Sequence, residues 1–369
     1  MIYFDNAATS YPKPRSVIKA SVRCLKEYCA NPGRSTHDMA VRSAEAVYET
    51  REIIADYIGF ASPERIAFTS NATHALNIAI KGLINHRCHV IVSDMEHNSV
   101  MRPLEAVARK YGVEISVYDT DLPLREAIIP LVRPDTEFLV TSIASNVTGK
   151  TLSVREISEI TRACSIKVIV DASQYLGHKR VDLSATPLDV ICAPGHKGLL
   201  GIQGSGFIAV GESVDPDDLM QGGSGGDTFR PEMPDYLPEK LEAGTLNVPA
   251  IVALGAGVRY LREYGYERIE NVLSRLTDRL YNTLLSVGAT IYGCGNGIAA
   301  FELPGISPSS LSGMLDMSGI ATRSGLHCAP GIHRKLGTDK YGCVRVSLSI
   351  FNTETELDML YNALNAVKN

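Results

Sequence analysis

The sequence predicts an α/β fold, in which a large domain with a mostly parallel, mixed sheet flanked by helices is joined to a smaller α+β domain. Three observations lead to this class. Between about residues 65 and 210, short β-branched runs alternate with segments whose apolar residues recur at helical spacing, which is typical of a parallel sheet covered by helices. The conspicuous polar residues of this region stand directly after the runs. Beyond residue 247 the alternation stops, and a long helical region leads into strand-like runs.

Seven runs of the first region are predicted to be strands, because each is short, rich in β-branched residues and followed by a change of pattern. In chain order they are RIAFTS, HVIVSD, EISVYD, EFLVTSIAS, KVIVDAS, LDVICAPG and GFIAV. Helical spacing predicts helices over ATHALNIAIKGLI and SVMRPLEAVARKYG, which lie between the earlier strands. Residues 221–241 are rich in glycine and proline, and this composition predicts a mobile loop or an irregular hairpin.

The second region has a different order of elements. A helical pattern runs from about residue 249 to residue 287, and the runs ATIYG, IAAFELPG and VRVSLSIF after it are strand-like. We expect a helix over residues 308–317 and a closing helix from residue 354 onward. Elements in this order predict a second, smaller α+β unit.

Composition describes an ordinary globular protein. The chain has 369 residues, a net charge of −5 and 21% charged residues, so its charge gives no reason to expect binding to nucleic acid. The longest apolar runs are strand-sized, which predicts no membrane span, and the start of the chain shows no secretion signal. The eight cysteines include no C-x-x-C pair. We therefore expect free thiols in a cytoplasmic protein.

Four polar residues that follow predicted strands are candidates for a site, because ligands of such sheets lie beyond the carboxyl ends of the strands. Lys197 is either a surface lysine on a turn or a buried amine that forms a Schiff base, and the glycines beside it would let backbone approach a flat cofactor. Asp171 is either a turn or capping carboxylate or the partner of a protonated pyridine nitrogen. Thr73 stands where a helix begins, in a place that suits either a simple cap or a bound phosphate. His97 either caps a helix or stacks on an aromatic cofactor.

The stretch RSGLHCAPGIH (323–333) places Cys328 in a loop next to a histidine. From these residues alone the thiol is structural, a metal ligand or a nucleophile. The spread of the cysteines argues against a disulfide. A metal site built on HCAPGIH needs at least one more ligand. Nucleophilic attack needs a thiolate, which His327 or Arg323 would favour if either lies close.

The motifs together resemble those of the class V branch of the fold-type-I pyridoxal-phosphate enzymes, and within it the cysteine desulfurases and selenocysteine lyases. In order along nearly the whole chain, these motifs are DNAAT, SNATHALN, DMEHNS, SNVTG, VDASQ, GHK, EAGTLN and RSGLHCAP. The resemblance implies a fold-type-I transferase fold with a large cofactor-binding domain at residues 17–255. The small domain would combine residues 1–16 with residues 256–369. The short loop around Cys328 is similar to that of the type II desulfurases.

The resemblance also implies roles around pyridoxal 5'-phosphate. Lys197 would be the Schiff-base lysine, Asp171 would pair with the pyridinium nitrogen, Gln174 would bind the phenolic oxygen and His97 would stack on the ring. The residues expected to hold the phosphate are Ala72, Thr73 and His196, with Thr245 reaching in from the second subunit of a homodimer. The residues expected to bind the substrate carboxylate are Asn146 and Arg345. Those that resemble residues at the mouth of the site are Arg34, His37 and Arg323.

The activity implied by the resemblance is sulfur transfer. Cys328 would take the sulfur of L-cysteine as a persulfide, leave L-alanine behind, and pass the sulfur to an acceptor, which is a protein in many type II systems. Two alternatives stay open: a selenocysteine lyase, and another class V lyase or aminotransferase in which Cys328 is dispensable. A purely scaffolding protein would have no need of Lys197 and Asp171. The requirement for the thiol distinguishes the leading interpretation from the others.

Overall fold

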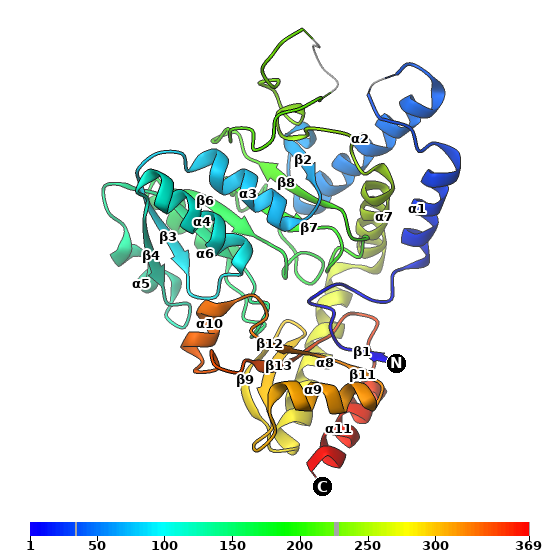
Figure 1. Ribbon diagram of the computed structural model, residues 1–369, viewed down its shortest axis with the longest axis vertical. Helices are drawn as coiled ribbons and strands as arrows, with labels where there is room; N and C mark the ends of the chain where they lie inside the picture. The colour runs from blue at the N-terminus through cyan, green and yellow to red at the C-terminus, as the bar shows by residue number, and fades with distance from the viewer. Residues whose placement is uncertain (34, 225–228, 369) are drawn as a thin grey trace.

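The computed structural model describes residues 1–33, 35–224 and 229–368, which form two main sheets and their covering helices (Figure 1). The larger sheet has seven strands in the order β2-β8-β7-β6-β5-β3-β4. Its strands are β2 (Ile66–Thr69), β3 (His89–Ser93), β4 (Glu114–Tyr118), β5 (Thr136–Ser142), β6 (Lys167–Asp171), β7 (Val190–Pro194) and β8 (Gly206–Val210). All pairs from β4 through β7 are parallel, and β8 is antiparallel to both β7 and β2. The seven predicted strands are thereby confirmed, as a mostly parallel mixed sheet.

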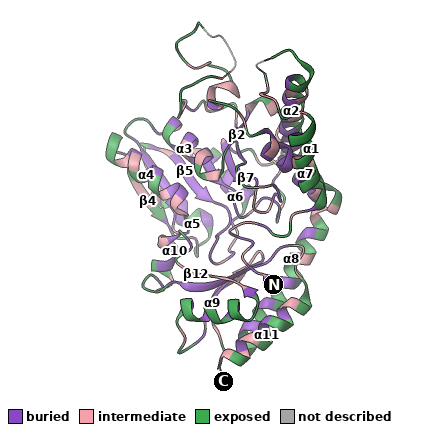
Figure 2. Cartoon of the chain, turned by 45° about the vertical axis from the view of Figure 1, so that its right-hand side comes forward, coloured by how far each residue is buried: buried purple, intermediate pink, exposed green. Residues whose placement is uncertain are grey.

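The strands of this sheet are continuous apolar runs because both faces of the sheet are covered. Alternate side chains of β3 pack into two different cores: Val90 and Val92 belong to one, and Ile91 belongs to the other. A strand with two buried faces gains no advantage from alternating apolar and polar residues. Figure 2 shows the buried strands at the centre and the exposed residues on the outer faces of the helices.

Seven helices surround the larger sheet in the described part of the chain. They are α1 (Arg15–Glu27), α2 (Asp38–Ile58), α3 (Ala72–Leu83), α4 (Asn98–Tyr111), α5 (Leu124–Ile128), α6 (Val154–Ala163) and α7 (Val248–Tyr264). The helices expected around residues 72–84 and 99–112 are confirmed as α3 and α4. Side chains cap both N-termini, since Asn71 accepts from the His74 N–H and His97 accepts from the Ser99 N–H. These caps fix where each helix begins, directly after a strand of the sheet.

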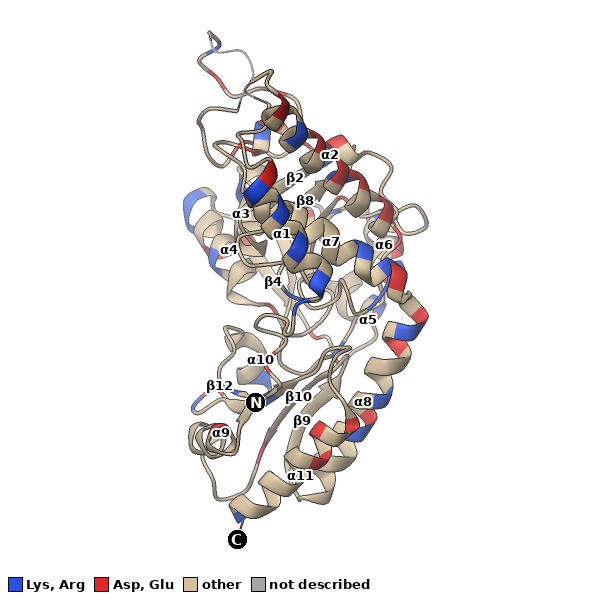
Figure 3. Cartoon of the chain, turned by 90° about the vertical axis from the view of Figure 1, so that its right-hand side faces the viewer, with Lys and Arg blue, Asp and Glu red and all other residues tan. Residues whose placement is uncertain are grey.

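The smaller sheet is antiparallel, with the order β12-β13-β10-β9. Its strands are β9 (Thr290–Gly295), β10 (Ile298–Glu302), β12 (Arg323–Gly325) and β13 (Cys343–Ser347), while β1 (Ile2–Tyr3) pairs with β11 (Ile320–Ala321). The accompanying helices are α8 (Tyr266–Ser286), α9 (Pro308–Met317), α10 (Pro330–Lys335) and α11 (Glu354–Lys368). Charged residues of both signs lie along α8, and acidic residues gather at the start of α11 (Figure 3); ion pairs such as Arg275–Glu354 link the two helices. The predicted strands and the helices α9 and α11 are confirmed.

The helical region expected over residues 249–287 is two helices rather than one. Helix α7 ends at Tyr264, and α8 begins at Tyr266. Between them, Gly265 has a φ of +90°, a conformation that residues with a Cβ rarely adopt and that turns the chain. The helical periodicity continues across this glycine, which explains why the pattern alone suggested a single element.

The predicted domain boundary at residue 255 falls inside α7, which packs against α1 and α2. At the other end of the chain, β1 pairs with β11, whereas the Ser10 N–H binds the carbonyl of His196 beside the larger sheet. Of residues 221–241, the described part contains turns and a short 3₁₀ helix at Glu239–Leu241, and residues 225–228 lie outside the description. Among the described helices, none is both long and apolar enough to cross a membrane.

Candidate active site

The carboxyl ends of the parallel strands open onto a cavity of about 230 Å³. Most of the residues predicted from the sequence line it: Ala72, Thr73, His97, Asn146, Asp171, Gln174, His196, Lys197, Arg323 and Arg345. They come from the large sheet, from its helix starts and from β12 and β13. The cavity therefore lies where the two sheets meet, at the carboxyl ends of the parallel strands. This edge is where an open parallel sheet is predicted to bind a ligand.

Asp171 is the last residue of β6, Lys197 follows the neighbouring strand β7, and both line the same cavity. Asp171 is buried, accepts a bond from the Ser173 N–H at 2.9 Å, and has no ion-pair partner among the described residues. Burial lowers the pKa of Lys197 to about 8, against the opposing attraction of the Asp171 carboxylate. A substantial fraction of the Lys197 amine is therefore neutral near physiological pH, as nucleophilic attack on a carbonyl carbon requires.

Glycines allow the loop that carries Lys197 to pack against the turn that follows Asp171. A Cβ on Gly198 would lie 2.2 Å from the carbonyl oxygen of Leu176, and a Cβ on Gly177 would lie 2.0 Å from that of Gly198. Only backbone without side chains allows this approach. The glycine after Lys197, expected to face a flat cofactor, instead packs the Lys197 loop against the turn that follows Asp171.

His97 and His196 flank the cavity as neutral rings. Burial and the nearby Lys197 amine lower the pKa of each histidine to about 4. Nδ1 of His97 accepts from the Ser99 N–H at 3.1 Å, so the neutral ring carries its proton on Nε2. The carbonyl of His196 accepts bonds from the side chains of Thr9, Ser10 and Lys13, which hold the start of the loop in place.

Two buried polar atoms at the cavity have no hydrogen-bond partner among the described residues: Nδ1 of His196 and Nε of Arg345. Beside the same cavity, α3 begins with Ala72 and Thr73, and the partial positive charge of a helix N-terminus favours a phosphate. An amine, an unpaired carboxylate, a neutral ring and an anion-binding helix start are the groups needed to hold pyridoxal 5'-phosphate. The residues present fit this cofactor.

Arg345 is almost fully buried and is oriented by the chain itself. It donates to the carbonyl of Asn146 at 3.0 Å and forms an ion pair of 2.6 Å with Asp5. Its Nε lacks a partner, so one N–H stays available to a carboxylate in the cavity. The Asn146 side chain donates to the carbonyl of His327 at 2.8 Å and so links the large sheet to the Cys328 loop.

Cys328 is exposed, and its loop is held in an unusual conformation. His327 has a φ of +49° and Cys328 a φ of +57°, a region that costs about 1–2 kcal/mol for each residue with a Cβ. The strain is offset by bonds to both carbonyls, from the Asn146 side chain to His327 and from the Asn98 N–H to Cys328 at 2.7 Å. Nη2 of Arg323 lies 4.0 Å from the sulfur. The loop thus presents the thiol in a defined place, beside a positive charge.

Behind the thiol, two buried histidines form a directional chain of hydrogen bonds. Nε2 of His327 lies 3.3 Å from the carbonyl of Arg323, to which it can only donate. Nδ1 of the neutral His327 ring is then an acceptor, and Nε2 of His333, 3.3 Å away, donates to it. Nδ1 of His333 accepts from the hydroxyl of Thr338 at 2.8 Å. The loop therefore rests on a buried polar network in which every ring nitrogen is satisfied.

The further ligand that a metal site would need does lie nearby. The thiol of Cys343 and the ring nitrogens of His327 and His333 are within 4.8 Å of one another. Burial raises the pKa of Cys343 to about 12, which favours the neutral thiol over the thiolate that binds metal. Because the ring nitrogens already bind one another, hydrogen bonding accounts for this cluster.

Replacement of His333 by phenylalanine tests the network. The change keeps the ring volume similar but leaves Nδ1 of His327 buried without a donor, which costs about 1–3 kcal/mol of unfolding free energy. His333→Gln retains an N–H and should lose less. Urea unfolding of both variants measures the difference. Equal losses from the two substitutions would contradict the hydrogen-bond chain.

Glu96 is a buried carboxyl group that the sequence analysis missed. It precedes His97, accepts from the Ser142 N–H and hydroxyl at 2.7 Å, and also binds the hydroxyl of Ser93. These bonds tie the end of β3 to the end of β5. Burial raises the pKa of Glu96 from 4.5 to about 7, with the hydrogen bonds opposing the shift. A single acidic residue among polar neighbours gave no sequence signal for this burial.

The raised pKa of Glu96 predicts a pH dependence of stability. The folded protein keeps this proton up to about pH 7, whereas the unfolded chain releases it near pH 4.5. The stabilisation is complete below the unfolded pKa and is lost as pH rises through the folded pKa, by about 3 kcal/mol. Glu96→Gln removes the ionisation, so the thermal midpoint of the variant should gain on wild type between pH 5 and pH 8. A difference in thermal midpoint between variant and wild type that stays constant over this pH range would contradict the prediction. Such a constant difference is expected for the exposed Glu105→Gln.

Of the predicted residues that the structure describes, Thr245, His37 and Cys328 do not line this cavity. Thr245 is exposed, as is His37, which caps α2 by accepting from the Ala40 N–H at 3.3 Å. Arg34 lies outside the described residues. A threonine that serves a second subunit would not line the cavity of its own chain, so the role of Thr245 stays a prediction. The roles expected for His37 and Arg34 at the mouth also stay predictions.

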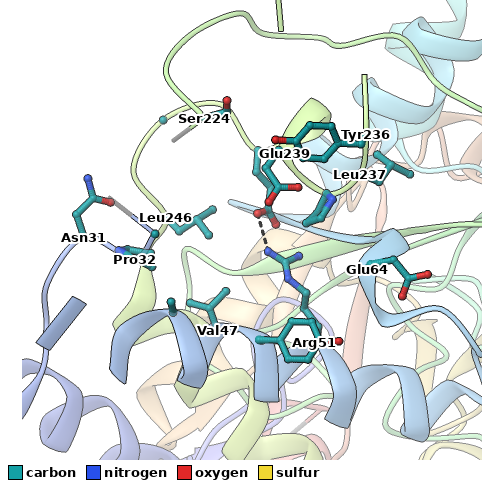
Figure 4. A pocket seen from close by; sticks show the side chains of 16 residues that line it. Asn31, Pro32, Val47, Arg51, Glu64, Ser224, Tyr236, Leu237, Glu239 and Leu246 are labelled. Atoms are coloured by element: carbon teal, nitrogen blue, oxygen red, sulfur yellow. Dashed lines mark hydrogen bonds and ion pairs between the residues drawn. The ribbon is translucent and has the colours of Figure 1, made fainter. Parts of the chain in front are cut away.

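A larger cavity, of about 550 Å³, lies between α2 and residues 236–246 (Figure 4). Its most conspicuous group, Arg51, forms a buried ion pair of 2.6 Å with Glu242 and also binds the carbonyl of Ile66. The charge of Arg51 is thus already neutralised, and the cavity is lined by none of the candidate catalytic residues. Its size alone does not make it the better candidate.

Comparison with known proteins agrees with this geometry. Residues 2–360 match the family model of the class-V aminotransferases. The chain is 33% identical to a probable cysteine desulfurase of Methanothermobacter thermautotrophicus, over 99% of this chain and 94% of the relative. It is 32% identical to another probable cysteine desulfurase, from Synechocystis, over 99% of this chain and 90% of the relative.

Solved structures give the same result. The apo structure of a cysteine desulfurase from Thermococcus onnurineus superposes with a TM-score of 0.91 at 28% identity and covers 99% of this chain and 94% of that one. The cysteine desulfurase CsdA of Escherichia coli superposes with a TM-score of 0.88 at 25% identity, with the same coverage of both chains. The chain therefore belongs to the class-V aminotransferase family and, within it, to the group of the cysteine desulfurases.

Proposed function

We propose that this protein is a pyridoxal 5'-phosphate-dependent cysteine desulfurase, which converts L-cysteine to L-alanine and keeps the sulfur on Cys328 as a persulfide. One observation carries the proposal: a buried Lys197 amine, with its pKa lowered to about 8, shares a cavity with the Asp171 carboxylate, and a thiol is fixed at the mouth of the same site. The first pair suits the cofactor, and the thiol suits the transfer of sulfur. Relatives named cysteine desulfurases support this reaction over one that does not use the thiol.

Each residue role follows from its position. Asp171 would hold the pyridinium nitrogen, His97 would lie against the ring, and Gln174 would face the phenolic oxygen. Gln174 already donates one N–H to the carbonyl of Ala7 at 2.8 Å and retains the other. Thr73 and the start of α3, with His196, would hold the phosphate.

Substrate recognition and the chemical step use the remaining groups. Pyridoxal 5'-phosphate held by these residues would supply an aldehyde for the amino group of the substrate and a ring that accepts electrons from Cα. The free N–H of Arg345 binds the substrate carboxylate, and the Lys197 amine moves the proton at Cα. The Cys328 thiolate forms a bond to the substrate sulfur while the bond from that sulfur to Cβ breaks. Cβ keeps the electron pair of that bond and takes up the proton of the substrate thiol. L-alanine leaves, and the transferred sulfur stays on Cys328 for an acceptor.

We further propose that two copies of the chain form a homodimer, in which Thr245 of each copy completes the phosphate site of the other. All eight cysteines lie in the described part of the chain and are free, which supports a reducing, cytoplasmic setting. The exposed thiol of Cys328 supports delivery of sulfur to a partner.

The proposed function is tested by the products formed from L-cysteine. The purified protein, loaded with pyridoxal 5'-phosphate and supplied with a reductant, should release alanine and sulfide in equal amounts. L-serine, which has the same amine and carboxylate but no sulfur, should give no alanine. Pyruvate and sulfide in place of alanine would contradict the proposal and indicate a lyase.

A further inference from the structure

The Cys328 thiol faces a second cavity, separate from the one that suits the cofactor. This outer cavity has a volume of about 330 Å³, and Cys328 forms part of its wall. The residues that line it are Thr73, Asn77, Lys81, His97, Asn98, Ser99, Arg102, Pro103 and Cys328. Thr73, His97 and Ser99 also line the cofactor cavity, whereas Cys328 does not. A molecule that takes sulfur from Cys328 can therefore approach from the outer cavity without displacing the cofactor.

The outer cavity is positively charged. Lys81 and Arg102 are both exposed, and neither forms an ion pair with any described residue. No carboxylate is among the described residues that line the cavity. The N-terminus of α4, which begins at Asn98, adds the partial positive charge of its helix dipole. Arg323 contributes a further positive charge 4.0 Å from the sulfur. Such a concentration of one sign attracts and orients an anion.

The chemistry of a persulfide makes this charge useful. A thiolate of the acceptor attacks the outer sulfur of the Cys328 persulfide, and the sulfur–sulfur bond of the persulfide breaks. The acceptor becomes a persulfide and Cys328 returns as a thiolate, so the step needs no oxidant or reductant beyond the acceptor thiol. The attacking group is itself anionic, and a second negative charge on the acceptor would be held by Lys81 or Arg102.

We propose that the outer cavity binds the sulfur acceptor and selects a small thiol that carries a carboxylate. This inference rests on the proposed function and names the acceptor class of the same thiol. The volume suits a small molecule, because ligand pockets begin at about this size. Lys81 and Arg102 are then specificity-determining residues: they bind the carboxylate while the thiolate meets the persulfide.

The test compares two small thiols as acceptors of sulfur from the cofactor-loaded enzyme. Cys328 is first converted to the persulfide with L-cysteine, and its decay is followed with 3-mercaptopropionate or with the neutral 2-mercaptoethanol. The quantity measured is the second-order rate constant with 3-mercaptopropionate divided by that with 2-mercaptoethanol. Because the intrinsic reactivity of each thiol is the same with every variant, it cancels when this ratio is compared between variants. The double variant Lys81→Gln/Arg102→Gln should lower this ratio by about three- to tenfold at low salt. Arg109→Gln, which removes one positive charge further along α4, should keep the wild-type ratio.

The outcomes separate the two proposals. If L-cysteine leaves no persulfide on Cys328, both the proposed function and this inference are wrong. If the persulfide forms but the double variant has the wild-type ratio, only the acceptor site is wrong. A ratio lowered equally by Arg109→Gln would also overturn it, because the effect would then come from net charge. Preference for a glutamate-flanked cysteine peptide over 3-mercaptopropionate would overturn the choice of a small thiol.

Discussion

Cys328→Ala is expected to abolish transfer of sulfur from L-cysteine while the protein keeps the absorbance of bound cofactor. The exposed thiol is not part of the lining of the cavity that would hold pyridoxal 5'-phosphate. Loss of the attacking nucleophile should lower the rate of alanine formation by about a thousandfold or more. Alanine and sulfide release, measured with a reductant present, gives the comparison.

A matched control for Cys328 is available on the same chain. Cys29 is also a free, exposed cysteine, but it lies at the end of α1 and lines neither cavity. Cys29→Ala should retain the wild-type rate. If Cys328→Ala forms alanine as fast as wild type, the thiol is dispensable. The chain would then catalyse a lyase or selenocysteine reaction instead.

Lys197→Ala is expected to remove the covalent attachment of the cofactor and with it the activity. The neutral amine is the group that bonds to the aldehyde carbon, and no other lysine lines the described cavity. The absorbance of bound cofactor should shift to that of the free aldehyde, and turnover should fall by about a thousandfold or more. Because the pKa of Lys197 is about 8, attachment of cofactor to the apo-protein should speed up through pH 8 and then level off.

The control for Lys197 comes from a repeated tripeptide. Gly-His-Lys occurs at residues 195–197 and again at 177–179. Lys179 lines a different cavity, beside α8, and Asp171 is not among the residues that line that cavity. Lys179→Ala should keep both the absorbance and the turnover. Loss of cofactor from Lys179→Ala, or normal absorbance in Lys197→Ala, would contradict the assignment.

The sequence predicted the sheet and the half of the site that belongs to it. Strands β3, β6 and β7 are short apolar runs; Asp171 ends β6, and His97 and Lys197 stand just beyond β3 and β7. Since parallel strands end at one edge, their order along the chain is enough to bring these side chains together. The matching motifs then supplied roles that position alone left open.

The other half of the site depends on contacts that no local pattern encodes. The ion pair that orients Arg345 joins residues 5 and 345, and its second bond goes to the carbonyl of Asn146. The support behind Cys328 comes from His333, which the sequence suggested only as a weak metal ligand. The separate lining of the cofactor cavity and of the cavity at the thiol was likewise not predicted, nor was the left-handed backbone of His327 and Cys328. Tertiary packing decides each of these features.

The position of the transferred sulfur tests the account most directly. The cofactor-loaded protein is mixed with one equivalent of L-cysteine without reductant, digested, and its cysteine-containing peptides are weighed by mass spectrometry. The account predicts one added sulfur atom on the peptide that contains Cys328, in an amount equal to the L-alanine formed. L-alanine without added sulfur on Cys328, or with the sulfur on another cysteine, would contradict it.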